Sequence, residues 1–145
     1  MPLIGDEVIQ ASIVAKIKSV VAITSLLSNG ATEVRELEWQ GDTFSYPNVR
    51  IELEDNRFYF DEQSRCSLQA VEWSVYIFSQ QRSSKECSQI KTAVINALVG
   101  IGFSNQTYNT KFSTVRLVEN VPAVREDDRT WRSQIRLSSK VTAIV

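Results

Sequence analysis

Residues 68–78 read LQAVEWSVYIF, and this stretch decides the fold. Its large apolar side chains recur at every second position: Val71, Trp73, Val75 and Ile77. A two-residue period places these side chains on one face of a β-strand. The opposite face is partly apolar too, because it carries Tyr76 and Phe78. Apolar character on both faces is typical of a strand inside a sheet, so we expect residues 68–78 to form its central strand.

Three other segments predict strands around this one. In residues 49–54, apolar and charged side chains alternate, which indicates a half-buried strand. Residues 129–145 alternate over a longer span and predict a final strand. Residues 32–39 predict a short edge strand, followed by a turn at 40–42.

Two segments have the three- and four-residue apolar spacing of amphipathic helices. The first covers residues 6–28, and its β-branched run at 20–24 is a poor helix interior where the helix can break. The second covers residues 84–98, with Ser83 and Glu86 as a capping box and a glycine after its end. We therefore expect two α-helices that each bury one face.

The rest of the chain predicts turns and a hairpin. The polar pair Asp55-Asn56 predicts a turn. Side chains of different character alternate loosely in residues 112–118, which predicts a hairpin with the final strand. Residues 122–128 predict a charged loop before that strand. The element order is then α-β-β-β-α-β-β in a single domain, residues 1–145. This order predicts an α+β fold, in which two α-helices pack on one face of an antiparallel or mixed β-sheet.

Charge and composition exclude several classes of function. The chain has 145 residues, with 16 Lys and Arg against 17 Asp and Glu, so its net charge is −1. No overall basic charge attracts it to nucleic acid or to an anionic membrane. The sequence contains no histidine, which is the commonest general base and metal ligand. We therefore expect no catalytic centre, no cofactor, and no membrane-spanning or secretory segment.

Carboxylates are the remaining candidates for chemistry. Glu52 and Glu54 share one side of a predicted strand, where they could hold a divalent ion or serve a glycosidase. Solvated side chains opposite an apolar face are the simpler interpretation. Asp127 and Asp128 lie in a polar loop, but they lack the ligand alternation and the glycine of a calcium loop.

The two cysteines have neither the number nor the spacing of a disulfide framework or a zinc site. We interpret Cys66 and Cys87 as free thiols. Cys87 lies near the start of a predicted helix, where the helix dipole can lower a thiol pKa. It also lies on the apolar stripe of that helix, which favours core packing.

Residues 55–65 are too aromatic for a free loop and too polar for a core strand. Either a neighbouring subunit covers them, or they form a hairpin that folds back within the chain. If a neighbouring subunit covers them, this segment and the 122–128 loop are the candidate subunit or partner interface. Its candidate residues are Phe58, Tyr59, Phe60, Arg65, Arg125, Asp127 and Asp128.

A basic row is predicted on the outer face of the final strand. It consists of Arg132, Arg136 and Lys140. Such a row could meet an acidic neighbour or a DNA phosphate, or it could simply keep the strand soluble.

The layout resembles the tail terminator, or tail completion, proteins of long-tailed bacteriophages. The resemblance begins with an N-terminal amphipathic helix and a Tyr-Pro entry to a strand, YPNVRI at 46–51. It continues with a long central strand ending in VYIF at 75–78, a helix over 84–98, and a last strand over 131–143 that nearly reaches the terminus. The resemblance covers most of the chain. It rests on the order of the elements and on their residue patterns, without an invariant motif.

This resemblance implies a structural virion protein that needs no cofactor. Its subunits would form a ring, usually of six, that caps the tail tube, ends tube polymerisation and presents a surface to the head connector. The implied partners are further copies of the chain, the tail tube protein and the connector or stopper proteins, with DNA passing through the ring. The implied location is the tail or neck of a virion assembled in the bacterial cytoplasm.

Three alternatives remain open from the sequence. The chain could be a head-completion or stopper protein of the neck, which also forms rings. It could be a non-viral interaction domain that dimerises through a sheet edge. It could be a metal-dependent hydrolase that uses Glu52, Glu54 or Asp127.

Overall fold

The computed structural model describes residues 3–38, 45–61 and 66–144. These residues form an α+β fold, as predicted, with three α-helices, one 3-10 helix and seven strands in one sheet. In chain order the elements are α1 (Asp6–Lys18), α2 (Val21–Thr24), η1 (Gly30–Glu33), β1 (Val34–Glu36), β2 (Asn48–Asp61), β3 (Cys66–Ser79), α3 (Lys85–Leu98), β4 (Phe103–Asn105), β5 (Thr110–Phe112), β6 (Arg116–Arg125) and β7 (Trp131–Ala143).

The sheet is mixed, with the strand order β1-β2-β3-β7-β5-β4. Strand β1 pairs parallel to β2, and the other described pairings are antiparallel. Strand β7 pairs with β5 near its C-terminal end and with β6 along its N-terminal part. Strand β3 is paired along both edges, with β2 on one side and β7 on the other, so the predicted central strand is confirmed.

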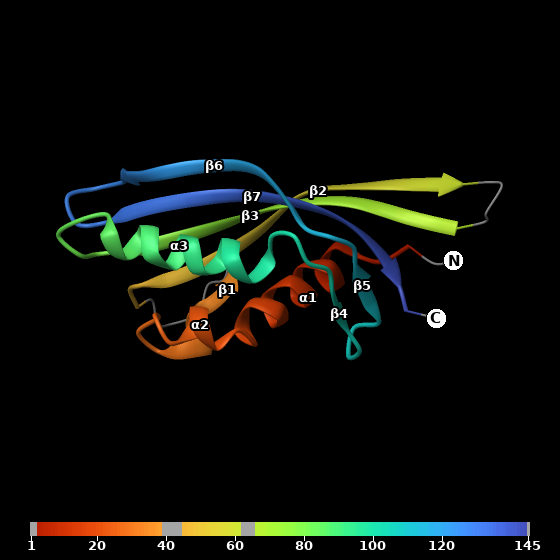
Figure 1. The fold of residues 1–145 in the computed structure, drawn as a ribbon, viewed down its shortest axis with the longest axis horizontal. Helices are drawn as coiled ribbons and strands as arrows, with labels where there is room; N and C mark the ends of the chain where they lie inside the picture. The colour runs from red at the N-terminus through yellow and green to blue at the C-terminus, as the bar shows by residue number, and fades with distance from the viewer. Residues whose placement is uncertain (1–2, 39–44, 62–65, 145) are drawn as a thin grey trace.

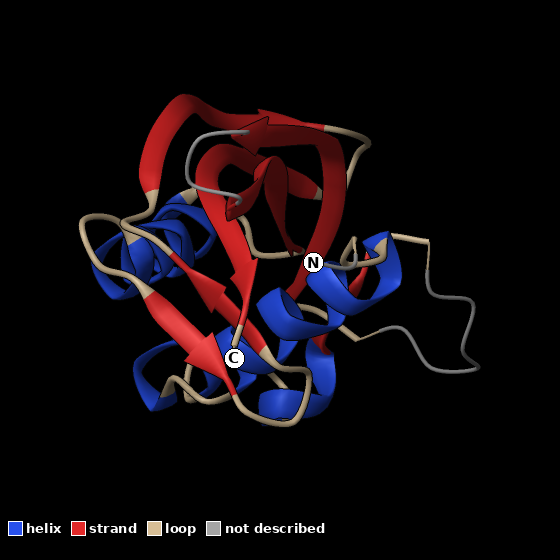
Figure 2. Cartoon of the chain, turned by 90° about the vertical axis from the view of Figure 1, so that its right-hand side faces the viewer, coloured by secondary structure: helices blue, strands red, loops and turns tan. Residues whose placement is uncertain are grey.

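Helices α1 and α3 lie on the same side of the long strands (Figure 1). Seen along the sheet, the strands are strongly curved and the helices lie beneath them (Figure 2). Trp73 of β3 is fully buried in this layer and meets the ring of Phe112 edge-on, with 6.1 Å between ring centroids. The core is completed by fully buried aliphatic side chains from the helices and strands, among them Ile9, Ile13, Ile17, Ile51, Val75, Ile77, Ile90, Val94, Leu98, Ile135 and Leu137.

The first predicted helix is divided and shorter than expected. Helix α1 ends at Lys18, Val20 has an extended backbone, and α2 is a single short turn. The break falls at Ser19 and Val20, at the start of the β-branched run, and the rest of that run resumes as α2. No helix in the described part of the chain is long and apolar enough to cross a membrane.

The turn predicted at Asp55-Asn56 is wrong, because β2 runs straight through it to Asp61. A β-bulge between Leu53 and Asp55 takes up the extra residue. Asn56 then faces the helices, where its side-chain amide donates to Asp6 Oδ1 over 2.7 Å and its oxygen accepts from Gln69. Its polar groups are thus satisfied by the start of α1, so no turn is needed.

The second predicted helix is confirmed as α3, but its capping box does not form. The N-cap is Ser84, without a side-chain capping bond. The carboxylate of Glu86 instead accepts from the Ser79 hydroxyl and from the Gln81 amide. Gly100, just after the helix, has a φ of +87°, which is the left-handed conformation expected of a helix stop.

The predicted loop at 122–128 is too long, because β6 continues to Arg125. Pro122 lies in this strand, in a stretch of irregular register between Val121 and Val124. Proline is tolerated there because β6 is an edge strand, whose pairing in the described chain is with β7 alone. Strands β4 and β5 were not predicted, so the element order α-β-β-β-α-β-β is incomplete. The predicted turn at 40–42 and Trp39 lie outside the described residues.

Truncating Trp73 should test how much of the fold depends on this core. Trp73→Ala removes a fully buried ring and leaves a cavity, so it should lower the free energy of unfolding by about 3–5 kcal/mol. Urea denaturation followed by circular dichroism measures this change. Val118→Ala, at a side chain that is 49% exposed, should change it by less than about 0.5 kcal/mol. Equal effects of the two substitutions would contradict the assignment of Trp73 to the core.

Candidate functional site

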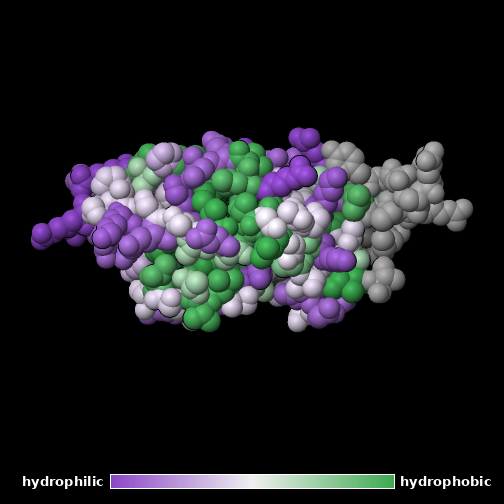
Figure 3. All heavy atoms as spheres, in the orientation of Figure 1, coloured by the Kyte–Doolittle hydropathy of each residue, from purple (hydrophilic) through white to green (hydrophobic). Residues whose placement is uncertain are grey.

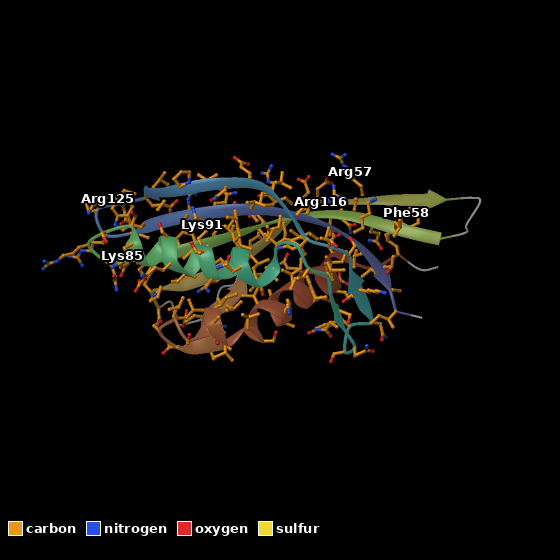
Figure 4. The ribbon with its side chains drawn as sticks, in the orientation of Figure 1. Arg57, Phe58, Lys85, Lys91, Arg116 and Arg125 are labelled. Atoms are coloured by element: carbon orange, nitrogen blue, oxygen red, sulfur yellow. The ribbon has the colours of Figure 1, made fainter. Side chains whose placement is uncertain are left out.

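The ends of β2 and β3 project beyond the helices as a hairpin arm, residues 56–61 paired with 66–71 (Figure 1). At its base, residues 69–71 also pair with β7, so the arm is two-stranded only beyond Gln69. The hairpin alternative for this segment is therefore confirmed. Phe58 is 46% exposed on the arm (Figure 4). The side chains of Tyr59 and Phe60, and residue Arg65, lie outside the described part of the structure. Whether a neighbouring subunit covers these four residues stays a prediction.

The bulge explains why Phe58 is exposed. Shifting a strand by one residue moves its side chains to the opposite face. Before the bulge, Leu53 shares the helix side with Trp73; after it, Asn56 and Phe58 take that side. Asn56 reaches the start of α1, but Phe58 lies two residues farther along the arm and is left uncovered.

The turn between β6 and β7 is held by its own polar groups. Asp127 Oδ1 accepts from the backbone amides of Arg129 and Thr130, both over 2.8 Å. The Arg125 guanidinium donates to the Asp128 carbonyl and lies 5.4 Å from the centre of the Trp131 ring. The amide hydrogen bonds, first that of Arg129, hold the pKa of the Asp127 carboxyl below its ordinary value. Asp127 therefore stabilises the turn.

The predicted basic row is largely neutralised. Arg132 pairs with Glu126 over 3.0 Å and lies 6.0 Å from the centre of the Tyr76 ring. Arg136 pairs with Glu54 and, at 4.0 Å, with Glu119. Lys140 is exposed and makes no ion pair in the described part of the chain. The row therefore does not present three uncompensated positive charges.

Glu54 belongs to a hydrogen-bonded network on the outer face of the sheet. It accepts from Ser74 Oγ over 2.7 Å, and Ser74 Oγ accepts from the Gln134 amide over 3.1 Å. Burial raises the pKa of the neighbouring Glu52 carboxyl, and the charges of Glu54 and Glu38 raise it further. Residues 3–38, 45–61 and 66–144 contain no group of three Asp, Glu, Cys or His side chains arranged to hold a metal ion.

Cys87 is a buried free thiol, as predicted. Its Sγ donates to the carbonyl of Ile77 over 3.2 Å. Burial raises the pKa of this thiol, so core packing outweighs any lowering by the helix dipole. The side chain of Cys66 lies outside the described residues.

Sequence reasoning missed a buried ion pair between Arg50 and Glu33. Arg50 is 1% exposed, and its Nη1 donates to the Glu33 carbonyl over 2.8 Å. Its Nη2 lies 3.6 Å from Glu33 Oε2. Burial lowers the pKa of Arg50, and the charge of Glu33 opposes this. The pair fastens η1 to β2, although Arg50 occupies a position that alternation alone assigns to the solvent side.

A polar pocket on the outer face was also missed. It has a volume of about 490 Å³ and lies where the segment between β5 and β6 passes over β7. Its charged lining residues are Asp55, Arg57, Glu72, Arg116 and Lys140. These residues come from four separate segments, so no local sequence pattern connects them.

The surface also carries exposed apolar side chains. Figure 3 shows apolar areas over the middle of β6 and α3 and over α2, separated by hydrophilic surface. On β6 the exposed apolar residues are Leu117, Val118 and Val124; near α2 they are Val21 and Leu26. Scattered apolar residues are ordinary on a surface, but β6 combines them with an open strand edge.

The lowered pKa of Asp127 predicts a pH-dependent stability. Asp127→Ala should lower the free energy of unfolding at neutral pH, because two backbone amides lose their acceptor. A carboxyl with a lower pKa in the folded state stabilises fully above the unfolded value of about 3.9. This contribution is lost as the pH falls through the lower folded pKa.

Urea denaturation at a series of pH values should therefore show the difference between wild type and Asp127→Ala shrinking in acid. Asp128→Ala is the matched control, because no hydrogen bond to its carboxylate is found among the described residues. A difference that stays constant with pH would contradict this role of Asp127.

Comparison with known proteins finds the fold but no sequence family. No protein-family model matches the chain, and no curated protein matches it. Among solved structures, it is similar to a chain of a structure described as the virion of a native gene transfer agent (GTA) particle. The TM-score is 0.72 with 16% sequence identity, over 91% of this chain and 92% of that chain. The two chains therefore share one fold over nearly their whole lengths.

Proposed function

We propose that this chain is a structural subunit of a phage-like virion. The observation that carries the proposal is the shared fold with a chain of a gene transfer agent virion, over 91% of one chain and 92% of the other. The proposed role is to bind other virion proteins, and it requires no catalytic centre or cofactor.

Within the virion, the specific role we propose is that of a tail terminator. The support comes from the order of the elements, which resembles that family from the N-terminal helix to the long last strand. A subunit of this kind adds to the growing tail tube, stops its polymerisation and offers a new surface to the head. Its mechanism is steric, because an occupied tube end cannot accept another tube subunit.

The surface of the chain suits a ring of identical subunits. A ring needs two different patches on each copy, one that binds the next copy and one that is bound. The hairpin arm and the turn between β6 and β7 lie at opposite ends of the long strands (Figure 1). The open edge of β6 adds a third surface along one side of the molecule.

Two measurements test this function at its two levels. Mass spectrometry of purified particles should find peptides of this chain, which tests membership of the virion. Polymerising the tail tube protein of the same particle, with and without this chain, tests the terminator role. Electron microscopy should then show shorter tubes with one end covered by a ring.

Other outcomes identify the alternatives. Unchanged tube lengths, together with binding to the head connector, would replace the terminator by a stopper protein. A stable dimer in native mass spectrometry that binds neither partner would support a non-viral interaction domain. Absence from purified particles would overturn the virion proposal.

The aromatic residues of the arm should contribute to assembly. Replacing Phe58, Tyr59 and Phe60 together by alanine should shift the assembly to at least tenfold higher protein concentration, because buried aromatic side chains dominate many interfaces. Native mass spectrometry over a concentration series measures the shift. Replacing the exposed Val21, Leu26 and Tyr108 is the matched control for loss of surface apolar area. Assembly unchanged by the arm substitutions would remove the arm from the interface.

A further inference from the structure

The rim of the pocket on the outer face is hydrogen-bonded to strand β7. This rim is formed by Ser113 and Thr114, in the segment that joins β5 to β6. The Ser113 amide donates to the Lys140 carbonyl over 2.8 Å, and the Lys140 amide donates to Ser113 Oγ over 3.1 Å. Ser139 Oγ donates to the Ser113 carbonyl over 2.8 Å. The rim is thus fastened to β7, and the cationic residues around it have fixed backbone positions.

The charges of this pocket are incompletely balanced. Asp55 and Arg57 pair with each other over 2.7 Å on one wall. Arg116 and Lys140 lie on the other side, and neither makes an ion pair within residues 3–38, 45–61 and 66–144. Glu72 is the remaining acid of the lining. The pocket therefore keeps an excess of positive charge on the side of β6 and β7.

The turn between β6 and β7 is acidic on balance. Glu126, Asp127 and Asp128 are consecutive and exposed, and the exposed Arg125 and Arg129 flank them, so three acids stand against two arginines. Glu126 is engaged by Arg132, and Asp127 by the turn's own amides. The Asp128 carboxylate has no ion-pair partner among the described residues, while its backbone is held by Arg125. The turn presents this acid from a fixed backbone.

The pocket and the turn cannot meet within one molecule. Arg116 begins β6 and Arg125 ends it, so they are separated by about 30 Å of extended strand. Figure 4 places Arg116 beside Arg57 in the middle of the molecule and Arg125 at its far end. Each copy therefore carries one acidic turn and one basic pocket that only another copy can join.

We propose that the acidic turn between β6 and β7 of one copy docks into the pocket of Arg116 and Lys140 on the next copy. This inference rests on the proposed function, since it supplies a contact by which copies assemble. The contact is heterologous, because two different patches meet, and it closes into a ring when the rotation between copies allows. A cavity of about 490 Å³ accommodates a turn with its side chains.

The ion pairs orient the contact more than they strengthen it. Exposed pairs contribute about 0.2–1 kcal/mol each, whereas charge complementarity selects the partner surface and the register. The assembly should accordingly weaken from low to high salt concentration.

Charge reversal with complementation tests the contact. The pocket variant is Arg116→Glu with Lys140→Glu, and the turn variant is Asp128→Lys, which leaves the hydrogen bonds of Asp127 intact. Each variant alone should need at least tenfold more protein to assemble in native mass spectrometry, because like charges then face each other. An equimolar mixture of the two should recover assemblies with equal numbers of both, and so should one chain carrying all three substitutions.

A matched control separates this contact from general charge effects. Lys18→Glu with Lys111→Glu makes the same change in net charge at two exposed lysines outside the pocket lining, and it should assemble like wild type. Circular dichroism and the melting temperature check that every variant is folded. Recovery in the mixture cannot arise from a folding defect, since neither partner is changed by mixing.

The outcomes distinguish this contact from the function it would serve. Variants that assemble like wild type, a mixture that assembles no better than its components, or a wild-type chain that never self-associates would each overturn the contact. If the contact is overturned but the chain still limits the length of tail tubes, the proposed function stands without this contact. If complementation succeeds but the wild-type rings leave tube length unchanged, the contact stands and the terminator role falls.

Discussion

Strand β3 has hydrogen-bonded neighbours along both of its edges, and this constraint governs the rest of the structure. Its successive side chains point alternately to the two faces of the sheet. The face with Val71, Trp73, Val75 and Ile77 is covered by the helices and closed to water. The opposite face, with Ser74 and Tyr76, carries the polar network and the pocket. The polar network, the pocket wall on β2 and the side of the arm that carries Phe58 are therefore placed by their register relative to this strand.

The bulge between Leu53 and Asp55 is the main departure from this regular register. It places Glu54 and Asp55 on the outer face, where Glu54 accepts from Ser74 and Asp55 pairs with Arg57 at the pocket. It also turns Asn56 and Phe58 toward the helix side. One extra residue thus supplies an acid to the outer network, lines the pocket and determines which side of the arm carries Phe58.

The periodicity of apolar residues predicted the strands and the helix that bury one regular face. The predictions that were wrong concern polar residues whose partners lie far away in the sequence. The alternation in β3 and β7 and the stripe of α3 are local patterns, so sequence alone could identify them. Asn56 looked like a turn residue, but its partner is Asp6, fifty positions away. Arg50 looked like a solvated residue, but Glu33 of η1 satisfies it in the interior. The pocket depends on strand pairing between distant segments, which no single stretch of sequence encodes.

The distribution of charge argues for a role in oriented assembly. The net charge is −1, and most of the described arginines on the outer face are engaged by carboxylates of the same chain. Internal pairing of this kind weakens the positive electrostatic field that would otherwise attract DNA or a membrane non-specifically. Among the charges left over, Asp128 lies at one end of β6 beside the exposed Arg129, and Arg116 with Lys140 lies at the other end. A two-fold contact through the pocket end would place Arg116 and Lys140 of one copy against the same residues of the other, so the proposed head-to-tail contact is the arrangement that avoids facing like charges there.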